Sequence, residues 1–552
     1  MSTAGSREAF VRAPDGSSLS RALWWGIPLA LILITLLIRL PLLDRIPHVD
    51  EFFHVITAQS ILDDGDLVTM DGVPYSRGWL FTYAVAGSFV LFGESFVAGR
   101  LVALAFGVLQ VLALFLVVRR YAGTFAACAA SIPLMLDPLA VELAQFVRFY
   151  TLHAVLFWIG AWSAYAMVDD GRSVRRRVLY AALAAAGFLG AFHLQLTTLI
   201  GILGVGIWVS AIVVYRVAST RPEVPEPLRR SPLVTTGVVM GAAITAGVLM
   251  LAFVPPLRSL VGGLTYVPQW AADVAGDSRV YARMMRDTWP LLWLAFPLLL
   301  VGALRLAPRP ASFAVTIFSV AFVLHTFAAW KSSRYLFYAL PFYFMVCGMG
   351  IAWFAKSFAD ATSRLVSGMV GVRLDRYAPR LASVLLLLAV GFALVQMPAV
   401  IRTKKWLSEN QPTSADGSPG LGRPDWGAAI DSIAPYVARN AAVHASSDVK
   451  AVYFLDQVDG YLHLPEPLNP SPADTLSPYT GRPRLFAVDR FLEEMSRSNL
   501  SVLVIEDAHW RTRHGVPDDL ADVIERSARS VPVPANWRLR IFVWENPPHE
   551  TE

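Results

Sequence analysis

Charged residues are scarce in this chain of 552 residues, because Asp, Glu, Lys and Arg together make up only 16% of it. A soluble domain carries about 25% charged residues. The shortage is concentrated in residues 22–400, whereas residues 401–552 have an ordinary soluble composition. The mean hydropathy of +0.50 agrees with this division. A wholly water-soluble protein is therefore excluded, and the sequence predicts one membrane domain followed by one soluble domain.

Cysteine is almost absent, since only Cys128 and Cys347 occur and both lie in apolar runs. A disulfide framework in the soluble part is excluded. That part also lacks a Gly-rich phosphate loop, a metal-spaced His or Cys cluster and a nucleophile elbow. No basic stripe interleaved with aromatic residues occurs, so the net charge of +5 predicts no nucleic-acid partner. The excess of Arg lies instead in short loops between apolar runs.

The membrane domain contains many apolar runs near the length of about 20 residues that a spanning helix needs. With the ambiguous run 79–93, they predict about 11–13 transmembrane helices. The clear runs are 22–43, 97–118, 122–140, 150–168, 178–195, 196–215, 233–254, 288–306, 311–329, 336–355 and 381–400.

Basic loops face the cytoplasm in multispanning proteins, and this rule predicts the topology. Residues 1–21 form a cytoplasmic tail, and the Arg-rich loops after residue 118 lie on the same side. The predicted outer segments are 44–78, 141–149, 255–287, 330–335 and 401–552. If both 22–43 and 79–93 crossed the membrane, the basic residues at 119–120 would lie outside. The predicted topology therefore requires that 79–93 is not a full span, or that 122–148 does not cross.

Residues 401–424 have the composition of a linker, and 425–552 are expected to form a small extracytoplasmic α/β domain. Within that domain, patterning predicts helices and strands in alternation. Helices are expected at 425–440, 485–497 and 517–529, and strands at 449–455, 500–506 and 538–545.

The most conspicuous charged group on the predicted outer side is Asp50-Glu51, directly after the first span. Adjacent carboxylates near a low-dielectric surface are costly unless they bind a cation or a basic partner. One of them can act as a general base toward an acceptor hydroxyl. The alternative is a solvated helix start, because His-Val-Asp-Glu is also a good helix N-terminus.

Several cations lie on the same predicted side: Arg77, Arg148, Lys331 and Arg334. Lys331 and Arg334 in a short outer loop run against the preference for positive charge inside. A lipid phosphate satisfies such cations through charge-assisted hydrogen bonds, although headgroup anchoring explains them equally well. Carboxylates and cations together suit a reaction in which a lipid phosphate leaves and a hydroxyl attacks.

The chain resembles the GT-C glycosyltransferases, in the branch that contains protein O-mannosyltransferases and lipid A aminoarabinose transferases. The resemblance covers residues 20–355. It is carried by DEFFHVITAQSILDDGD, PYSRGWLFTY, LFGESFVAGRL, VRFYTLH and KSSRYLFYALP, in that order. It implies a polyprenyl-phosphate-linked sugar as donor, with transfer on the extracytoplasmic side of the plasma membrane to a lipid, glycan or protein acceptor.

The resemblance also implies roles for individual residues. Asp50 corresponds to the catalytic base and Glu51 to its partner. The donor phosphate would be held by Arg77, Arg148, Lys331, Arg334 and Tyr335. His54, Tyr150 and His153 would line the acceptor or donor pocket.

Three departures from the branch bear on substrate and metal. His54 stands where Tyr is common, His153 stands near the position of another acidic residue, and Ser76-Arg77-Gly78 replaces a Glu-Lys-Pro stretch. They argue against aminoarabinose as the sugar. No cofactor is required by the pattern, and a divalent metal at Asp50 and Glu51 stays open.

Two other functions fit the same fold. A polyprenyl-lipid flippase or transporter would place its charges near the bilayer midplane, where only His193, Gln195 and His325 are found. An inactive scaffold would not need the acidic pair. The charge distribution therefore favours the enzyme.

Overall fold

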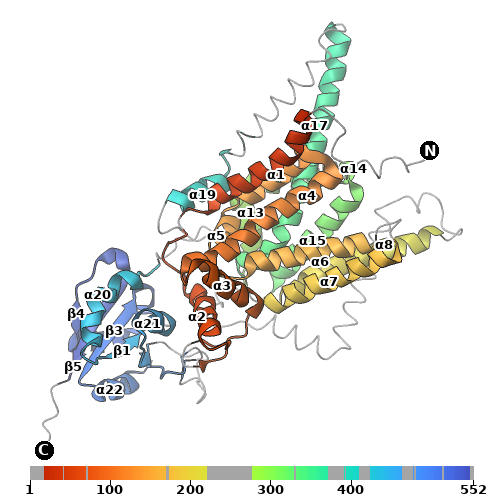
Figure 1. Ribbon diagram of the computed structural model, residues 1–552. Coiled ribbons are helices and arrows are strands. Elements are labelled where there is room, and N and C mark those ends of the chain that lie inside the picture. Colours follow the sequence, from red (N-terminus) through yellow and green to blue (C-terminus); the bar gives the residue numbers. More distant parts are fainter. Residues whose placement is uncertain are drawn as a thin grey trace, which may run out of the picture.

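The computed structural model describes most of the chain, with helices in its N-terminal two-thirds and an α/β unit near its C-terminus (Figure 1). The described residues are 18–41, 43–69, 72–168, 173–220, 276–328, 331–370, 391, 393, 395–408, 423–462, 476–477, 480–485, 487–512 and 515–546. The predicted span 233–254, most of 381–400 and most of the loop 255–287 lie outside these residues.

The first half of the helical part follows the predicted apolar runs, with one short helix between the first two. Its helices are α1 (Ser18–Arg39), α2 (Val49–Asp63), α3 (Trp79–Phe92), α4 (Phe96–Leu136), α5 (Pro138–Ala144), α6 (Tyr150–Met167), α7 (Val174–Leu194) and α8 (Thr198–Thr220). Helix α4 is bent at Gly123, whose φ of 85° and ψ of 171° suit only glycine. The bend falls at the start of the predicted run 122–140, so the runs 97–118 and 122–140 form two helices that are joined at Gly123.

The second half continues the bundle after residue 275. Its elements are α13 (Val280–Thr288), α14 (Pro290–Leu306), α15 (Pro308–Phe327), α16 (Ser333–Leu336), the 3-10 turn η4 (Phe337–Ala339), α17 (Leu340–Val370) and α19 (Pro398–Ser408). Within the described part, five helices are long and apolar enough to cross a membrane, or six if the bent pair α13 and α14 forms one span.

Helix α4 packs against α1, α3, α6 and α17, and small residues allow close helix contacts elsewhere. A Cβ on Gly187 of α7 would lie 2.7 Å from the backbone nitrogen of Gly160 in α6. In lipid, such close packing replaces the hydrophobic effect as the force between helices. Helix α3 has only 14 residues, about 21 Å of helix against a hydrocarbon core of about 30 Å. The run 79–93 is therefore shorter than an upright span, which favours the alternative in which it does not cross; the number of crossings before residue 119 stays a prediction.

The α/β unit is built on one mixed five-stranded sheet in the order β2-β1-β3-β5-β4. Strands β1, β2 and β3 are parallel, and β5 pairs antiparallel with β3 and β4. The strands are β1 (Ala442–Ala445), β2 (Gly460–Tyr461), β3 (Leu500–Glu506), β4 (Arg529–Val531) and β5 (Leu539–Glu545). The helices are α20 (Trp426–Val437), α21 (Asp448–Leu455), α22 (Val488–Ser496) and α23 (Asp518–Ser527), with 3-10 turns η6 (Asp507–His509) and η7 (Ala535–Trp537).

One predicted strand is wrong, because residues 449–455 form helix α21. The apolar sequence there suits either state, and a short apolar run cannot be assigned by periodicity alone. Asp456 ends the helix in a left-handed conformation with φ of 54°. Helix α21 packs on α2, where Phe52 meets Tyr453 and Phe454 edge to face at 5.0 and 5.8 Å. The α/β unit thus lies against α2 at one end of the bundle (Figure 1).

Candidate functional site

Helix α2 begins at a reciprocal cap that places two carboxylates in its first turn. The imidazole of His48 accepts from the backbone nitrogen of Asp50 at 3.1 Å, and the Glu51 carboxylate accepts from the backbone nitrogen of His48 at 2.8 Å. Acidic residues are favoured there because the first amides of a helix are unpaired and its dipole is positive. The acidic pair therefore does two things at once: it stands in the first turn of a helix, and its carboxylates face cations.

Glu51 is fully buried and is bonded by one guanidinium and two backbone amides. Arg100 of α4 donates to both of its oxygens, Nε to Oε2 and Nη2 to Oε1, each at 2.8 Å. The backbone nitrogen of Val147 donates to Oε2 at 2.9 Å, and Arg423 lies 3.7 Å from Oε1. Burial raises the pKa of Glu51, but the bidentate Arg100 outweighs it and the pKa is lowered. Glu51 therefore joins α2, α4 and the loop before α6.

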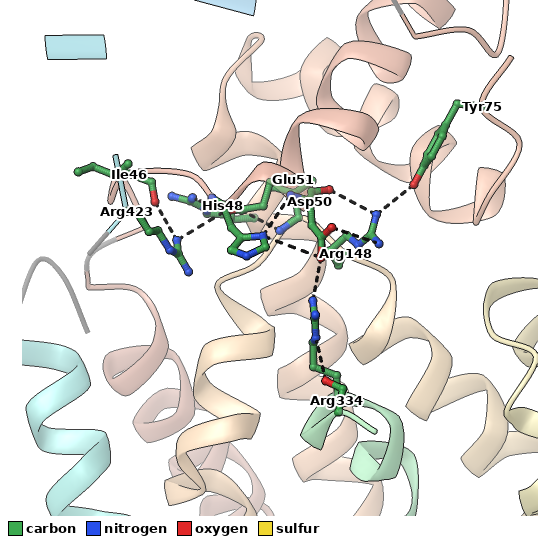
Figure 2. Close-up of polar contacts among 11 residues, drawn as sticks. Ile46, His48, Asp50, Glu51, Tyr75, Arg148, Arg334 and Arg423 are labelled. Atoms are coloured by element: carbon green, nitrogen blue, oxygen red, sulfur yellow. Dashed lines mark hydrogen bonds and ion pairs between the residues drawn. The ribbon is translucent and has the colours of Figure 1, made fainter. Parts of the chain in front are cut away.

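Asp50 keeps a quarter of its side chain exposed and faces two cations (Figure 2). Arg334 donates to Asp50 Oδ2 at 2.8 Å, and Arg148 Nη2 lies 3.9 Å from Oδ1. Burial raises the pKa of the Asp50 carboxyl, but Arg148 and Arg334 outweigh it and hold that pKa well below its usual range. The carboxylate is charged, partly accessible and surrounded by positive charge.

The cations come from segments far apart in the sequence. Arg148 precedes α6; its Nη1 donates to the Asp50 carbonyl at 3.3 Å and to the Tyr75 hydroxyl at 3.0 Å. Arg334 lies in α16, with its guanidinium 5.6 Å from the ring centre of Tyr150. The structure therefore brings together three of the predicted residues, Asp50, Arg148 and Arg334.

Arg77 reaches the same neighbourhood from the loop before α3. It is exposed, and its guanidinium lies over the ring of Phe149 at 5.7 Å. The next residue, Gly78, has φ of 68°, and a Cβ there would lie 2.7 Å from the Phe149 ring. Glycine is thus required for the turn that carries Arg77 past Phe149. Lys331 is partly buried three residues before Arg334, and Tyr335 is buried directly after it.

The three predicted pocket residues have different surroundings. Tyr150 is buried beneath Arg334. His54 is buried with Nδ1 2.9 Å from the Thr82 hydroxyl, and burial, Arg148 and Arg77 together lower its pKa well below the usual value. His153 lies one turn further along α6 and pairs with the Thr198 hydroxyl at 2.8 Å, away from the contacts of Asp50.

Sequence reasoning missed His48, Tyr75, Arg100 and Arg423 as parts of this site. Arg100 stands in the LFGESFVAGRL stretch, and a lone Arg within an apolar run is a signal for a buried partner. Arg423 lies in the predicted linker, yet it donates to the Ile46 carbonyl at 2.8 Å. Nothing in the composition of residues 401–424 distinguishes that contact from an ordinary linker.

The described residues do not fit a divalent metal at the acidic pair. They contain no group of three or more His, Cys, Asp or Glu side chains arranged around a common point. The oxygens of Glu51 are occupied by Arg100 and backbone amides, and Asp50 is flanked by Arg148 and Arg334. Guanidinium groups repel a divalent cation and already supply the positive charge that it would bring.

A helical membrane protein with a carboxylate among cations at one end of its bundle is the class that fold and site define. ArnT from Cupriavidus metallidurans in the apo state superposes with a TM-score of 0.58 at 16% identity, covering 95% of this chain and 98% of that one. ArnT bound to undecaprenyl phosphate gives 0.55 at 17% identity, over 95% of this chain and 98% of that chain.

A second kind of enzyme shares the fold. The archaeal oligosaccharyltransferase AglB from Archaeoglobus fulgidus, in complex with an inhibitory peptide and a dolichol-phosphate, gives a TM-score of 0.52 at 12% identity. It matches over 88% of this chain and 70% of that chain. No protein-family model and no curated protein matches the sequence. The chain has the GT-C fold, as the sequence motifs predicted.

Proposed function

We propose that this protein is a membrane glycosyltransferase that moves a sugar from a polyprenyl-phosphate donor to a hydroxyl acceptor on the extracytoplasmic side. The observation that carries the proposal is Asp50, a partly exposed carboxylate at hydrogen-bond distance from Arg334 and 3.9 Å from Arg148. The GT-C fold, shared with ArnT bound to undecaprenyl phosphate and with AglB bound to a dolichol-phosphate, supports it.

The reaction follows from the charges. The acceptor oxygen forms a bond to the anomeric carbon of the sugar, while the bond from that carbon to the phosphate oxygen breaks. The polyprenyl phosphate leaves with the electron pair, and Asp50 takes the acceptor proton. Arg77, Arg148, Lys331 and Arg334, with the Tyr335 hydroxyl, stabilise the negative charge that develops on the phosphate.

Donor binding would also activate the base. Without donor, Arg148 and Arg334 are directed at Asp50 and lower its pKa. A donor phosphate competes for both guanidinium groups, so Asp50 loses part of that stabilisation. Burial, which raises the pKa of Asp50, is then opposed less strongly. The pKa of Asp50 rises, and the carboxylate becomes a stronger base.

Glu51 acts in this scheme as a positioning residue. Its contacts with Arg100 and Val147 fix the first turn of α2 against α4 and against the loop that carries Arg148. The directions of Asp50 and Arg148 relative to each other depend on that junction. A sugar or acceptor does not need to touch Glu51 for this role.

The proposal is tested by donor turnover. Purified protein in nanodiscs is incubated with a panel of radiolabelled polyprenyl-phosphate hexoses and pentoses and with crude envelope lipid and glycan as acceptor. We expect one donor to be consumed by wild type and by Asp63→Asn, an exposed Asp at the end of the same helix, and not by Asp50→Asn. The proposal would be contradicted if no donor were turned over. If the protein also translocated a fluorescent polyprenyl lipid in proteoliposomes, that result would support a flippase.

A further inference from the structure

A cleft of about 310 Å³, with charged and apolar side chains in its walls, lies between the first turn of α2 and the α/β unit. Its volume is at the lower end of the range of about 300–1,000 Å³ for small-molecule sites. Helix α2 and the segment before it contribute His48 and Phe53. The α/β unit contributes residues from the ends of β1, β2 and β3: Ser446, Ser447, Asp448, Lys450, Tyr461, Glu506 and His509.

The cleft contains a buried ion pair. Lys450 donates to Glu506 Oε1 at 2.7 Å, with side chains only 6% and 7% exposed. Trp426 donates to the same oxygen at 2.9 Å, and Glu506 Oε2 lies 3.9 Å from His509 Nδ1. A buried ion pair is weak evidence for stability, since its desolvation offsets most of its attraction. Because Lys450 and Glu506 also line the cleft, a ligand that bonds to them explains their position better than stability does.

The charges around the cleft balance. Arg423 and Lys450 are cations, whereas Asp448 and Glu506 are carboxylates. Burial lowers the pKa of His509, and burial with the nearby Arg423 lowers the pKa of His48 to about 4, so both imidazoles are neutral at neutral pH. Such a site attracts neither a phosphate nor a peptide of one charge sign.

The chemistry favours a neutral ligand with many hydroxyl groups. A sugar hydroxyl can donate to a carboxylate and accept from an ammonium or guanidinium group at the same time. Phe53 and Tyr461 add apolar ring surface to the walls. The C–H groups of a sugar ring can pack against such surface while its hydroxyl groups bond to the charged side chains.

We infer that this cleft binds a neutral sugar unit of the acceptor, and this inference rests on the proposed glycosyltransferase function. The cleft lies next to the base, because His48 lines the cleft and its Nδ1 lies 3.9 Å from Asp50 Oδ2. Figure 2 shows Arg423 on one side of His48 and Arg148 on the other. The acceptor then approaches Asp50 from the α/β unit and the donor phosphate from the side of Arg148 and Arg334.

The experiment measures binding apart from turnover. Saturation-transfer NMR on the full-length protein in nanodiscs is recorded with methyl glycosides of mannose, glucose, galactose and arabinose, and with mannose 6-phosphate. We expect at least one neutral glycoside to bind. Glu506→Gln replaces a charged hydrogen-bond acceptor with a neutral amide, and His509→Ala removes the imidazole, so binding should weaken about ten-fold or more.

A matched control separates the cleft from a general loss of charge. Glu493→Gln makes the same change on an exposed carboxylate of α22 and should bind glycoside like wild type. His509 is one-third exposed, so its variant keeps the test valid if Glu506→Gln fails to fold. Equal binding by all variants, no glycoside binding, or tighter binding of mannose 6-phosphate would overturn the inference.

The outcome for the donor is read separately. If donor consumption needs Asp50 but no glycoside binds, the proposed glycosyltransferase function is supported and the sugar site in the cleft is contradicted. Glycoside bound in the cleft without turnover of any donor would remove the acceptor role and the proposed enzyme together.

Discussion

At the scale of single residues, the central feature is a base whose pKa is lowered by the groups that are proposed to bind the donor. Burial raises the pKa of Asp50, while Arg148 and Arg334 lower it by a larger amount. A carboxylate so stabilised is a weak base. The site becomes reactive only when the donor phosphate draws the two guanidinium groups away, which couples donor binding to base strength.

This coupling predicts two different pH profiles. The acid limb of kcat/KM reports the free enzyme and that of kcat reports the complex. In the free enzyme Asp50 has a lowered pKa, so kcat/KM should stay level from pH 8 to below about pH 4, the ordinary pKa of Asp. In the complex the pKa is higher, so kcat should fall at a higher pH than kcat/KM. Steady-state rates between pH 4 and 8 give both profiles, and acid limbs at the same pH would contradict the coupling.

Arg334 is predicted to contribute to donor affinity. Arg334→Gln removes a charge-assisted hydrogen bond worth about 1.5–3 kcal/mol, which corresponds to roughly 10–150-fold weaker binding of undecaprenyl phosphate. Arg334→Lys keeps the charge without the planar fork and should recover part of the affinity. Equilibrium binding of the radiolabelled lipid measures this. Arg305→Gln, at an exposed position on α14, is the control, and equal affinity in both Gln variants would rule out the role.

Sequence reasoning could find Asp50, Arg148 and Arg334 because unpaired charges beside apolar runs are conspicuous. It could not separate the roles of Asp50 and Glu51, since adjacent residues of the same type look alike in a sequence. The difference arises from the 100° turn between neighbours on a helix. That turn directs Glu51 into Arg100 and leaves Asp50 at the surface.

At the scale of elements, the site depends on the junction between α2 and α4. Arg100 joins them by two bonds to Glu51 and by bonds to the carbonyls of Leu43 and Arg45 at 2.6 and 2.8 Å. All three nitrogens of that guanidinium therefore donate to the segment before α2 or to its first turn. A buried pair with such geometry fixes one arrangement of two helices.

Breaking this junction should lower stability, and it should affect turnover more than donor affinity. Glu51→Gln leaves Arg100 buried without a counter-charge, which typically costs about 3–5 kcal/mol. The melting temperature should fall clearly, less so in Glu51→Leu with Arg100→Met, where no charge remains. Below the melting temperature, kcat should fall by a larger factor than the donor KM rises, because the junction also carries Arg148. Glu94→Gln, at an exposed position before α4, is the control, and a higher donor KM with normal kcat would contradict a positioning role.

The elements differ in how well the sequence predicts them. Long apolar runs such as α7 and α15 follow from composition, because a lipid environment leaves few other structures for them. The stretch VYFL in α21 favours a strand by residue preference, yet packing of Tyr453 on Phe52 holds a helix there. Such tertiary contacts are not visible in a window of seven residues.

At the scale of the whole molecule, four distant parts of the chain meet at one end of the bundle. Residues 44–78 contain the first turn of α2. Three other parts contact this turn or its neighbours: the loop before α6, residues 331–335 and the C-terminal part from Arg423 onward. This gathering agrees with the positive-inside rule, which predicted one side for all of them. The absolute side, with a cytoplasmic N-terminus, stays a prediction.

That topology can be tested with single cysteines. In a background of Cys128→Ala and Cys347→Ala, Glu493→Cys lies on the α/β unit and Arg176→Cys lies in the first turns of α7, both at exposed positions. A membrane-impermeant maleimide applied to intact cells should label the first and not the second. Lysed cells should show both labelled. Labelling of Arg176→Cys alone from outside would invert the topology.

The central claim is that Asp50 removes the acceptor proton while other groups bind the donor. Its most direct test is a single-turnover measurement with Asp50→Asn, using the donor that wild type consumes and recording sugar transfer and donor affinity in the same preparation. We predict a transfer rate lower by about 10²–10⁴-fold, the usual contribution of a general base, with donor affinity at least as tight as in wild type because both arginines are released. Transfer at the wild-type rate, or a loss explained entirely by weaker donor binding, would contradict the account.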